Sequence, residues 1–221
     1  MEIKVLRNIM EVNDYVAREN RRVFDEKGIL VLNLVSSPGA GKTTLLERTL
    51  DALKSEYSMA VIEGDIATQL DAERIQRHGV PVLQINTQGG CHLDANMIRN
   101  AIESLDLDGV RILFIENVGN LVCPAEFALG EDMKVTILSV TEGDDKPEKY
   151  PVMFQQSKAL VINKIDLLPY VDFDVEAAKR RALALNPRLT VFEVSCRTGQ
   201  GLADWLGWLR AKSEERACGQ A

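Results

Sequence analysis

Residues 29–44 of the chain read ILVLNLVSSPGAGKTT. The apolar run at 29–35 has the length and side chains of a buried strand. A pattern of helical spacing begins at Thr43 and continues through Leu53, directly after a loop of Ser, Pro and Gly. A strand that passes through a glycine-rich loop into a helix predicts the first unit of a parallel α/β sheet.

The same strand and helix pattern recurs along the rest of the chain. Further strands are expected at 58–62, 82–85, 111–115, 134–140, 159–162 and 190–194. Further helices are expected at 68–78, about 93–105, 175–185 and 202–212. Because apolar strands alternate with helices, we expect an α/β fold with a mostly parallel sheet of about seven strands and helices on both faces.

The chain divides into three parts by sequence pattern. Residues 1–28 predict an N-terminal helix packed on the domain, because Val12, Val16, Val23 and Phe24 fall at helical spacing and Gly28 follows as a terminating residue. Residues 29–213 predict one nucleotide-binding domain. Residues 214–221 are polar and small, and they predict a frayed tail.

Composition and charge exclude several classes of protein. Of the 221 residues, 46% are hydrophobic and 27% are charged, which excludes disorder or a fibrous repeat for the bulk of the chain. The net charge of −7 argues against a nucleic-acid partner, which would require a basic excess. No apolar run approaches the roughly 18 residues of a membrane span. Charged residues also interrupt the N-terminal stretch, so we expect neither a signal peptide nor a membrane partner, and a cytoplasmic location.

The loop after the first strand matches the Walker A pattern except that Ser36 stands at the first glycine position. Gly39 and Gly41 allow a tight turn whose backbone N–H groups converge on a phosphate. Lys42 supplies a positive charge to the β and γ phosphates and is a candidate catalytic residue, and Thr43 offers a hydroxyl to Mg²⁺. The candidate phosphate-binding residues are Ser37, Pro38, Gly39, Ala40, Gly41, Lys42, Thr43 and Thr44.

A second loop predicts that the base is guanine. The strand at 159–162 leads into Asn-Lys-x-Asp at 163–166, and the carboxylate of Asp166 can accept hydrogen bonds from guanine N1–H and the 2-amino group. Adenine has neither donor there and would leave the carboxylate unpaired. We therefore expect GTP and GDP as ligands. The candidate base-binding residues are Asn163, Lys164, Asp166, Ser195 and Cys196.

Two acidic residues at strand ends are candidate magnesium ligands. Asp65 and Glu116 lie at the carboxyl ends of expected strands, where such sheets bind their ligands, and they complete a Mg²⁺ site with Thr43. Asp65 is also the candidate for positioning the attacking water, although Asp65 as a helix cap is a serious alternative. Because Asn120 stands where a glutamine would orient the water, we expect slow intrinsic GTP hydrolysis.

A small set of cysteine and histidine residues lies next to these loops. Cys91 and His92 precede an expected helix, and Cys123 follows the loop that begins at Glu116. Thiolate and imidazole suit Zn²⁺ or Ni²⁺. Three ligands do not close a tetrahedral site, so a fourth would come from water, Asp94 or a second copy of the chain. Composition alone favours the simpler interpretation that the three residues are unrelated.

Several segments together resemble the HypB family of hydrogenase nickel-incorporation GTPases. They are QGGCHLDA at 88–95, ENVGNLVCPA at 116–125, the phosphate loop, EGD at 63–65 and EGDDK at 142–146. The resemblance runs from about residue 29 to residue 210. The urease accessory GTPases are the nearest alternative, but they carry Cys-Pro-His where this chain has Cys91-His92.

The resemblance implies a GTP-hydrolysing metallochaperone that assists nickel insertion into [NiFe]-hydrogenase. It implies a GTP-favoured homodimer that binds Ni²⁺ or Zn²⁺ through Cys91, His92 and Cys123 near the subunit interface. It also implies other hydrogenase maturation factors and the hydrogenase large subunit as partners. With no cysteine before Cys91 and no histidine before His78, we expect no nickel-storage tail. Another class of function stays open: a metal carrier, or a dimer held by structural zinc, with little functional turnover.

Overall fold

The computed structural model describes residues 4–66 and 70–218 of the chain. Within these residues, seven parallel strands form one sheet in the order β3-β2-β4-β1-β5-β6-β7. The strands are β1 (Leu30–Ser36), β2 (Met59–Asp65), β3 (Val82–Asn86), β4 (Ile112–Glu116), β5 (Met133–Ser139), β6 (Ser157–Asn163) and β7 (Thr190–Glu193). The expected fold class is confirmed: this is a P-loop type α/β fold with β1 near the middle of the sheet.

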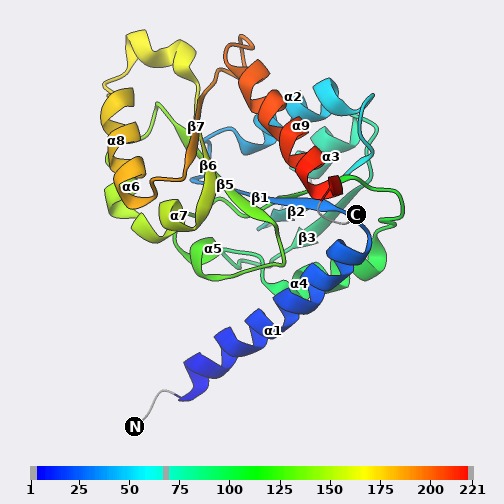
Figure 1. Cartoon of the computed structure of the whole chain (residues 1–221). Coiled ribbons are helices and arrows are strands. Elements are labelled where there is room, and N and C mark those ends of the chain that lie inside the picture. Colours follow the sequence, from blue (N-terminus) through cyan, green and yellow to red (C-terminus); the bar gives the residue numbers. More distant parts are fainter. Residues whose placement is uncertain (1–3, 67–69, 219–221) are drawn as a thin grey trace.

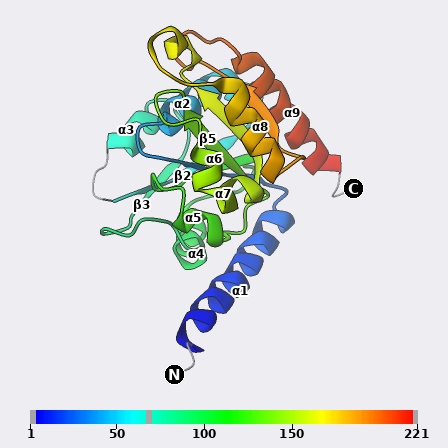
Figure 2. The ribbon, with the colours of Figure 1, turned by 90° about the vertical axis from the view of Figure 1, so that its left-hand side faces the viewer.

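Helices cover both faces of the sheet (Figures 1 and 2). The longer helices are α1 (Lys4–Glu26), α2 (Lys42–Leu53), α3 (Leu70–Gln76), α4 (Ala95–Ser104), α8 (Val175–Leu185) and α9 (Leu202–Cys218). Shorter ones are α5 (Cys123–Glu126), α6 (Lys146–Lys149), α7 (Pro151–Gln156) and the 3₁₀ helix η1 (Ile165–Tyr170). The four shorter helices lie in segments to which the sequence pattern assigned no helix, because one or two turns carry too little periodicity.

The alternation of side chains along β1 divides the core. Leu32 and Leu34 pack toward α2 and α9, in a cluster that includes Trp205. Val31 and Val35 point to the opposite face, toward the clusters that contain residues of α4 and α8. β1 is buried on both faces along its whole length. Because β1 is central in the sheet, the loop at its carboxyl end lies between the ends of the neighbouring strands.

Helix α1 extends away from the rest of the molecule at its N-terminal end (Figures 1 and 2). Its buried face consists of Asn13, Val16, Ala17, Asn20 and Phe24. Val12, which was expected on the apolar face, is 56% exposed. The prediction was wrong there because two asparagines, which the apolar pattern did not count, lie on the buried face.

The C-terminal helix is longer than predicted. α9 continues to Cys218, so the frayed tail expected from residue 214 is wrong over 214–218, and residues 219–221 lie outside the described part. Hydrogen bonds from Arg111 to Ser213 and ion pairs from Arg216 to Asp25 and Asp132 hold the end of this helix against the body. The expected helix at 68–78 begins at Leu70 in the described residues, and its first positions lie outside them. No helix among the described residues has the length and apolar character needed to cross a membrane.

Candidate functional site

The phosphate loop connects the end of β1 to the start of α2. Gly39 and Gly41 have φ angles of 77° and 97°, in the left-handed region that favours glycine. A Cβ at Gly41 would lie 2.5 Å from Nδ2 of Asn163, so this glycine also allows the two nucleotide loops to approach each other. Lys42 begins α2, and its Nζ lies 3.2 Å from Oγ of the buried Ser36. The loop and the helix N-terminus therefore present backbone N–H groups and a cation to an anion.

A cavity of about 450 Å³ opens beside this loop. Two strand ends supply carboxylates to it: Glu63 of β2 pairs in register with Glu116 of β4, and Asp65 follows at the end of β2. Thr43 donates its hydroxyl to Oε1 of Glu116 at 2.7 Å. The structure therefore brings Thr43, Asp65 and Glu116 to one cavity, together with Lys42.

The acidic end of this cavity fits a hard cation. Oε2 of Glu63 and Oε2 of Glu116 are buried, and neither has a hydrogen-bond partner among the described residues. Burial and the nearby carboxylate of Glu116 raise the pKa of Glu63 to about 8, and burial also raises the pKa of Glu116. Carboxylate oxygens without partners beside a threonine hydroxyl are the donor set that Mg²⁺ takes next to phosphates.

Glu63 was not among the magnesium ligands expected from the sequence. The structure places it in the cavity because Glu63 and Asp65 are two residues apart on a strand and share a face. The alternation of side chains along a strand was the sequence signal that could have identified Glu63 as a cavity residue. Oδ1 of Asp65 accepts from the N–H of Ile66 at 2.5 Å. Residues 67–69 lie outside the described part, so the alternative of Asp65 as a helix cap stays a prediction. Asp71 and Arg74 of α3 also line the cavity, and no motif pointed to them.

The expected base-binding residues lie together on the other side of the phosphate loop. Four of the five, Asn163, Lys164, Asp166 and Cys196, line a second cavity of about 400 Å³. Asn163 donates to the carbonyl of Ala40 at 3.0 Å and accepts from the N–H of Lys164 and of Cys196. The side-chain amide of Asn163 is thus hydrogen-bonded to three segments of the chain.

The remaining groups of this loop are held in defined positions. Lys164 has a φ of 65°, and its Nζ donates to the carbonyl of Gly39 at 2.7 Å, so its aliphatic stem spans the space between the two loops. Ser195 donates its hydroxyl to Oδ1 of Asp166 at 2.6 Å. That bond orients the carboxylate and leaves its second oxygen for the donors of a base.

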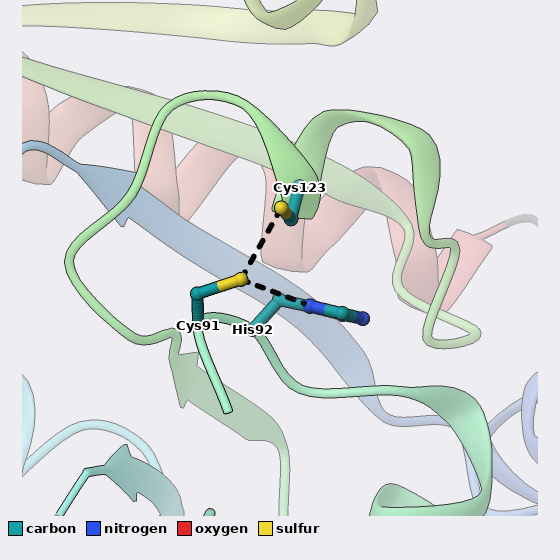
Figure 3. A group of neighbouring side chains, drawn as sticks. All are labelled: Cys91, His92 and Cys123. Carbon is teal, nitrogen blue, oxygen red and sulfur yellow. Dashed lines mark hydrogen bonds between the residues drawn. The ribbon is translucent and has the colours of Figure 1, made fainter. Parts of the chain in front are cut away.

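The three candidate metal ligands form one cluster (Figure 3). Sγ of Cys91 lies 3.2 Å from Sγ of Cys123 and 3.7 Å from Nδ1 of His92. The ligand atoms of all three residues lie within 4.8 Å of one another. Cys91 and His92 come from the loop before α4, and Cys123 begins α5, so two distant segments of the chain meet here.

The surroundings of the cluster affect the protonation of its three side chains. Burial lowers the pKa of His92, which favours the neutral imidazole that can bind a metal ion. Phe127 lies against its ring with centroids 4.1 Å apart. The adjacent thiol of Cys91 and burial raise the pKa of Cys123 in the metal-free cluster. Two thiols and an imidazole at this spacing suit Zn²⁺ or Ni²⁺.

The described residues supply three ligands to this cluster and no fourth His, Cys, Asp or Glu. Asp94, which was one expected source, is the N-cap of α4 and accepts from the N–H of Met97 at 2.8 Å. Its carboxylate is therefore engaged in capping. Water and a second copy of the chain stay as the sources of a fourth ligand.

The fold and the paired phosphate and base loops define a P-loop nucleotide-binding protein with an adjoining cluster of soft metal ligands. Residues 30–193 match the family model described as the CobW/HypB/UreG nucleotide-binding domain. The hydrogenase maturation factor HypB of Azotobacter chroococcum mcd 1 is 53% identical over 97% of this chain and 70% of its own length. The chain therefore belongs to the CobW/HypB/UreG family, and within it to the HypB hydrogenase maturation factors.

Solved structures agree with this assignment. The crystal structure of HypB from Helicobacter pylori in complex with nickel has a TM-score of 0.87 and 41% identity, covering 92% of this chain and 95% of that one. The crystal structure of HypB from Archaeoglobus fulgidus has a TM-score of 0.86 and 39% identity, covering 92% of this chain and 99% of that one. The expected family and fold are confirmed by these matches.

Proposed function

We propose that this chain is a GTP-hydrolysing metallochaperone that assists the insertion of nickel into [NiFe]-hydrogenase. One observation carries the proposal. The segment after β4 lines the phosphate cavity at Glu116 and Gly119 and then continues to Cys123 in the metal cluster. A movement of this segment in response to the phosphate would therefore change the distance between Cys123 and the ligands Cys91 and His92.

The nucleotide half of the function follows from the loops described above. The N–H groups of the phosphate loop and Lys42 would hold the phosphates, and Asp166 would select guanine. Thr43, Asp65 and Glu116 would hold Mg²⁺, which when bound neutralises charge on the phosphates. Asp65 would position the attacking water, since it lines the same cavity. The glutamine position taken by Asn120 supports slow hydrolysis of GTP to GDP.

The metal half of the function uses Cys91, His92 and Cys123. The nickel that is named for the Helicobacter pylori relative supports Ni²⁺ as the cargo here, and the same donor set accepts Zn²⁺. Because Asp94 caps α4, a second chain would supply the missing fourth ligand. Nucleotide would control that ligand by controlling dimerisation. We therefore infer a GTP-favoured homodimer in which residues 29–213 carry both sites. Other hydrogenase maturation factors and the hydrogenase large subunit would receive or supply the metal.

The test is a Ni²⁺ titration of the chain loaded with GDP and with a slowly hydrolysed GTP analogue, with the oligomeric mass measured in each state. The proposal expects a different metal affinity or stoichiometry in the two states and a dimer favoured by the analogue. A separate assay with GTP and Mg²⁺ is expected to release phosphate slowly. Equal affinity and equal mass in both states would instead support a carrier or a structural-zinc protein.

A further inference from the structure

Asn117 is a buried asparagine that lies between the two sites. It follows the magnesium candidate Glu116, lines the phosphate cavity and is 1% exposed. Its Oδ1 accepts from the N–H of Leu93 at 3.1 Å and from the N–H of Val118 at 3.0 Å. Because two N–H donors point at this oxygen, the amide orientation is fixed. Leu93 is the residue directly after His92, so this side chain joins the phosphate-facing loop to the first metal-bearing segment.

The amide nitrogen of Asn117 leads to the second metal-bearing segment. Nδ2 donates to Oδ1 of Asn33 at 3.2 Å, and Nδ2 of Asn33 donates to Oε1 of Glu131 at 3.1 Å. Oε2 of Glu131 accepts from the N–H of Leu129 at 2.6 Å. Leu129 is two residues beyond Phe127, whose ring contacts His92. A continuous chain of hydrogen bonds therefore runs from Asn117 to the segment that follows Cys123.

We propose that Asn117 is the positioning residue through which the nucleotide state sets the geometry of the cluster of Cys91, His92 and Cys123. This inference rests on the proposed function, because it requires that nucleotide and metal binding are coupled. A change at the phosphate moves Glu116 and Gly119, and the amide of Asn117 lies between them. Since its oxygen holds Leu93 and its nitrogen holds Asn33, displacement of this one side chain shifts both metal-bearing segments together.

Asn20 provides a matched control from the other side of the same segments. It is 2% exposed, and its Nδ2 donates to the carbonyl of Ala95 at 2.8 Å and to that of Leu129 at 3.1 Å. It is thus a buried asparagine with hydrogen bonds to both metal-bearing segments. However, it belongs to α1 and is not among the residues that line the phosphate cavity. Loss of Asn20 removes support from the cluster without removing a link to the nucleotide.

The experiment measures Ni²⁺ affinity by competition with a chromophoric chelator, with GDP and with a slowly hydrolysed GTP analogue, in the wild type, Asn117→Ala and Asn20→Ala. The ratio of the two affinities is the readout. We expect a ratio of about fivefold or more in the wild type and less than about twofold in Asn117→Ala. In Asn20→Ala we expect both affinities to fall by the same factor, so that the wild-type ratio is kept. If a general loss of packing were the cause in Asn117→Ala, Asn20→Ala would lose the ratio as well.

Each outcome bears on one of the two proposals. A wild-type ratio near one contradicts the proposed function itself. A clear wild-type ratio that persists in Asn117→Ala contradicts the role of Asn117 alone, and so does an equal loss of the ratio in Asn20→Ala. If Asn117→Ala does not fold, amide hydrogen exchange of the wild type decides. Exchange at Leu93 must then differ between the two nucleotide states, and identical exchange would overturn the inference.

Discussion

At the scale of single residues, the carboxylate of Asp65 is the group whose role in hydrolysis is most directly testable. It lies at the end of β2 and lines the same cavity as Lys42 and Thr43. We expect Asp65→Asn and Asp65→Ala to slow single-turnover GTP hydrolysis by about 100-fold or more, because both remove the charge that orients water and cation. Asp51→Asn is the control, since Asp51 pairs with Lys54 and His78 on the outside of α2. Hydrolysis at the wild-type rate in both Asp65 variants would exclude the role.

In the proposed function, the selection of guanine would depend on Asp166. Its carboxylate is oriented by the hydroxyl of Ser195, and its free oxygen acts as an acceptor. In Asp166→Asn the amide can donate, so we expect affinity for GTP to fall about 10- to 100-fold, the equivalent of one charged hydrogen bond. Xanthosine triphosphate carries a carbonyl at C2 and is expected to bind this variant better than GTP does. Fluorescence titration with both nucleotides measures the change, and unchanged preference for GTP would show that Asp166 does not contact the base.

The four cysteines differ in their expected reactivity. Burial raises the pKa of Cys196 to about 11, so at neutral pH its thiolate fraction is about 100-fold below that of a free cysteine. Cys91 and Cys218 are exposed. We expect iodoacetamide to modify these two first, and added Ni²⁺ to slow modification at Cys91 while leaving Cys218 unaffected. Peptide mass spectrometry reads each site separately. Equal protection of Cys218 would mean that the metal acts nonspecifically.

The site residues that could be predicted from the sequence are those whose chemistry is local. The expected roles of Gly39, Gly41 and Lys42 need only a single turn, and that of Asp166 needs only a loop of four residues, so their spacing alone carried the information. Asn117 and Glu63 were missed because their positions beside the phosphate loop depend on cross-strand pairing and on contacts between segments far apart in the sequence.

At the scale of elements, the attachment of α1 to the body depends on Gly130. This glycine has a φ of 99°, and a Cβ there would lie 2.8 Å from the carbonyl oxygen of Ala17 and 2.8 Å from Cβ of Asn20. We expect Gly130→Ala to lower stability by about 1–3 kcal/mol from backbone strain and by a further amount from these close contacts, with each kcal/mol equivalent to roughly 2–4 °C in melting temperature. Gly109→Ala is the matched control, because Gly109 has a φ of 75° with no atom within 4 Å of the added Cβ. An equal loss in both variants would attribute the effect to backbone strain and not to the helix contact.

The strands were predictable because each is an apolar run bounded by turn residues. The predicted run at 29–35 differs by one residue at each end from Leu30–Ser36. α8 was predicted with its observed bounds, because Asp174 caps it and the periodicity is regular. The end of α9 and the buried face of α1 were not predictable. Arg216, Arg111 and Asn20 act there through partners more than 70 residues away, which leave no local pattern.

At the scale of the whole molecule, the nucleotide site and the metal site both lie beyond the carboxyl ends of the strands of one sheet. If the two sites are coupled, binding at each must affect binding at the other. Coupling of binding free energies is reciprocal. If the GTP analogue changes Ni²⁺ affinity by some factor, Ni²⁺ must change the affinity for the analogue by the same factor. We expect that factor to lie in the usual range of about 5- to 150-fold, and to include the free energy of dimerisation where a second chain completes the metal site.

The measurement is a calorimetric titration of the GTP analogue with and without Ni²⁺, with GDP as the parallel ligand, in the wild type, Cys91→Ala and Cys123→Ala. Both cysteine variants are expected to lose the metal effect while they keep wild-type affinity for GDP. The reason is that neither thiol is among the residues that line the two nucleotide cavities. A variant that lost guanine nucleotide binding would identify its cysteine as a structural residue. If Ni²⁺ left the affinity for the analogue unchanged in the wild type, the nucleotide and metal sites would be neighbours that act independently, and hydrolysis could not drive the release of metal.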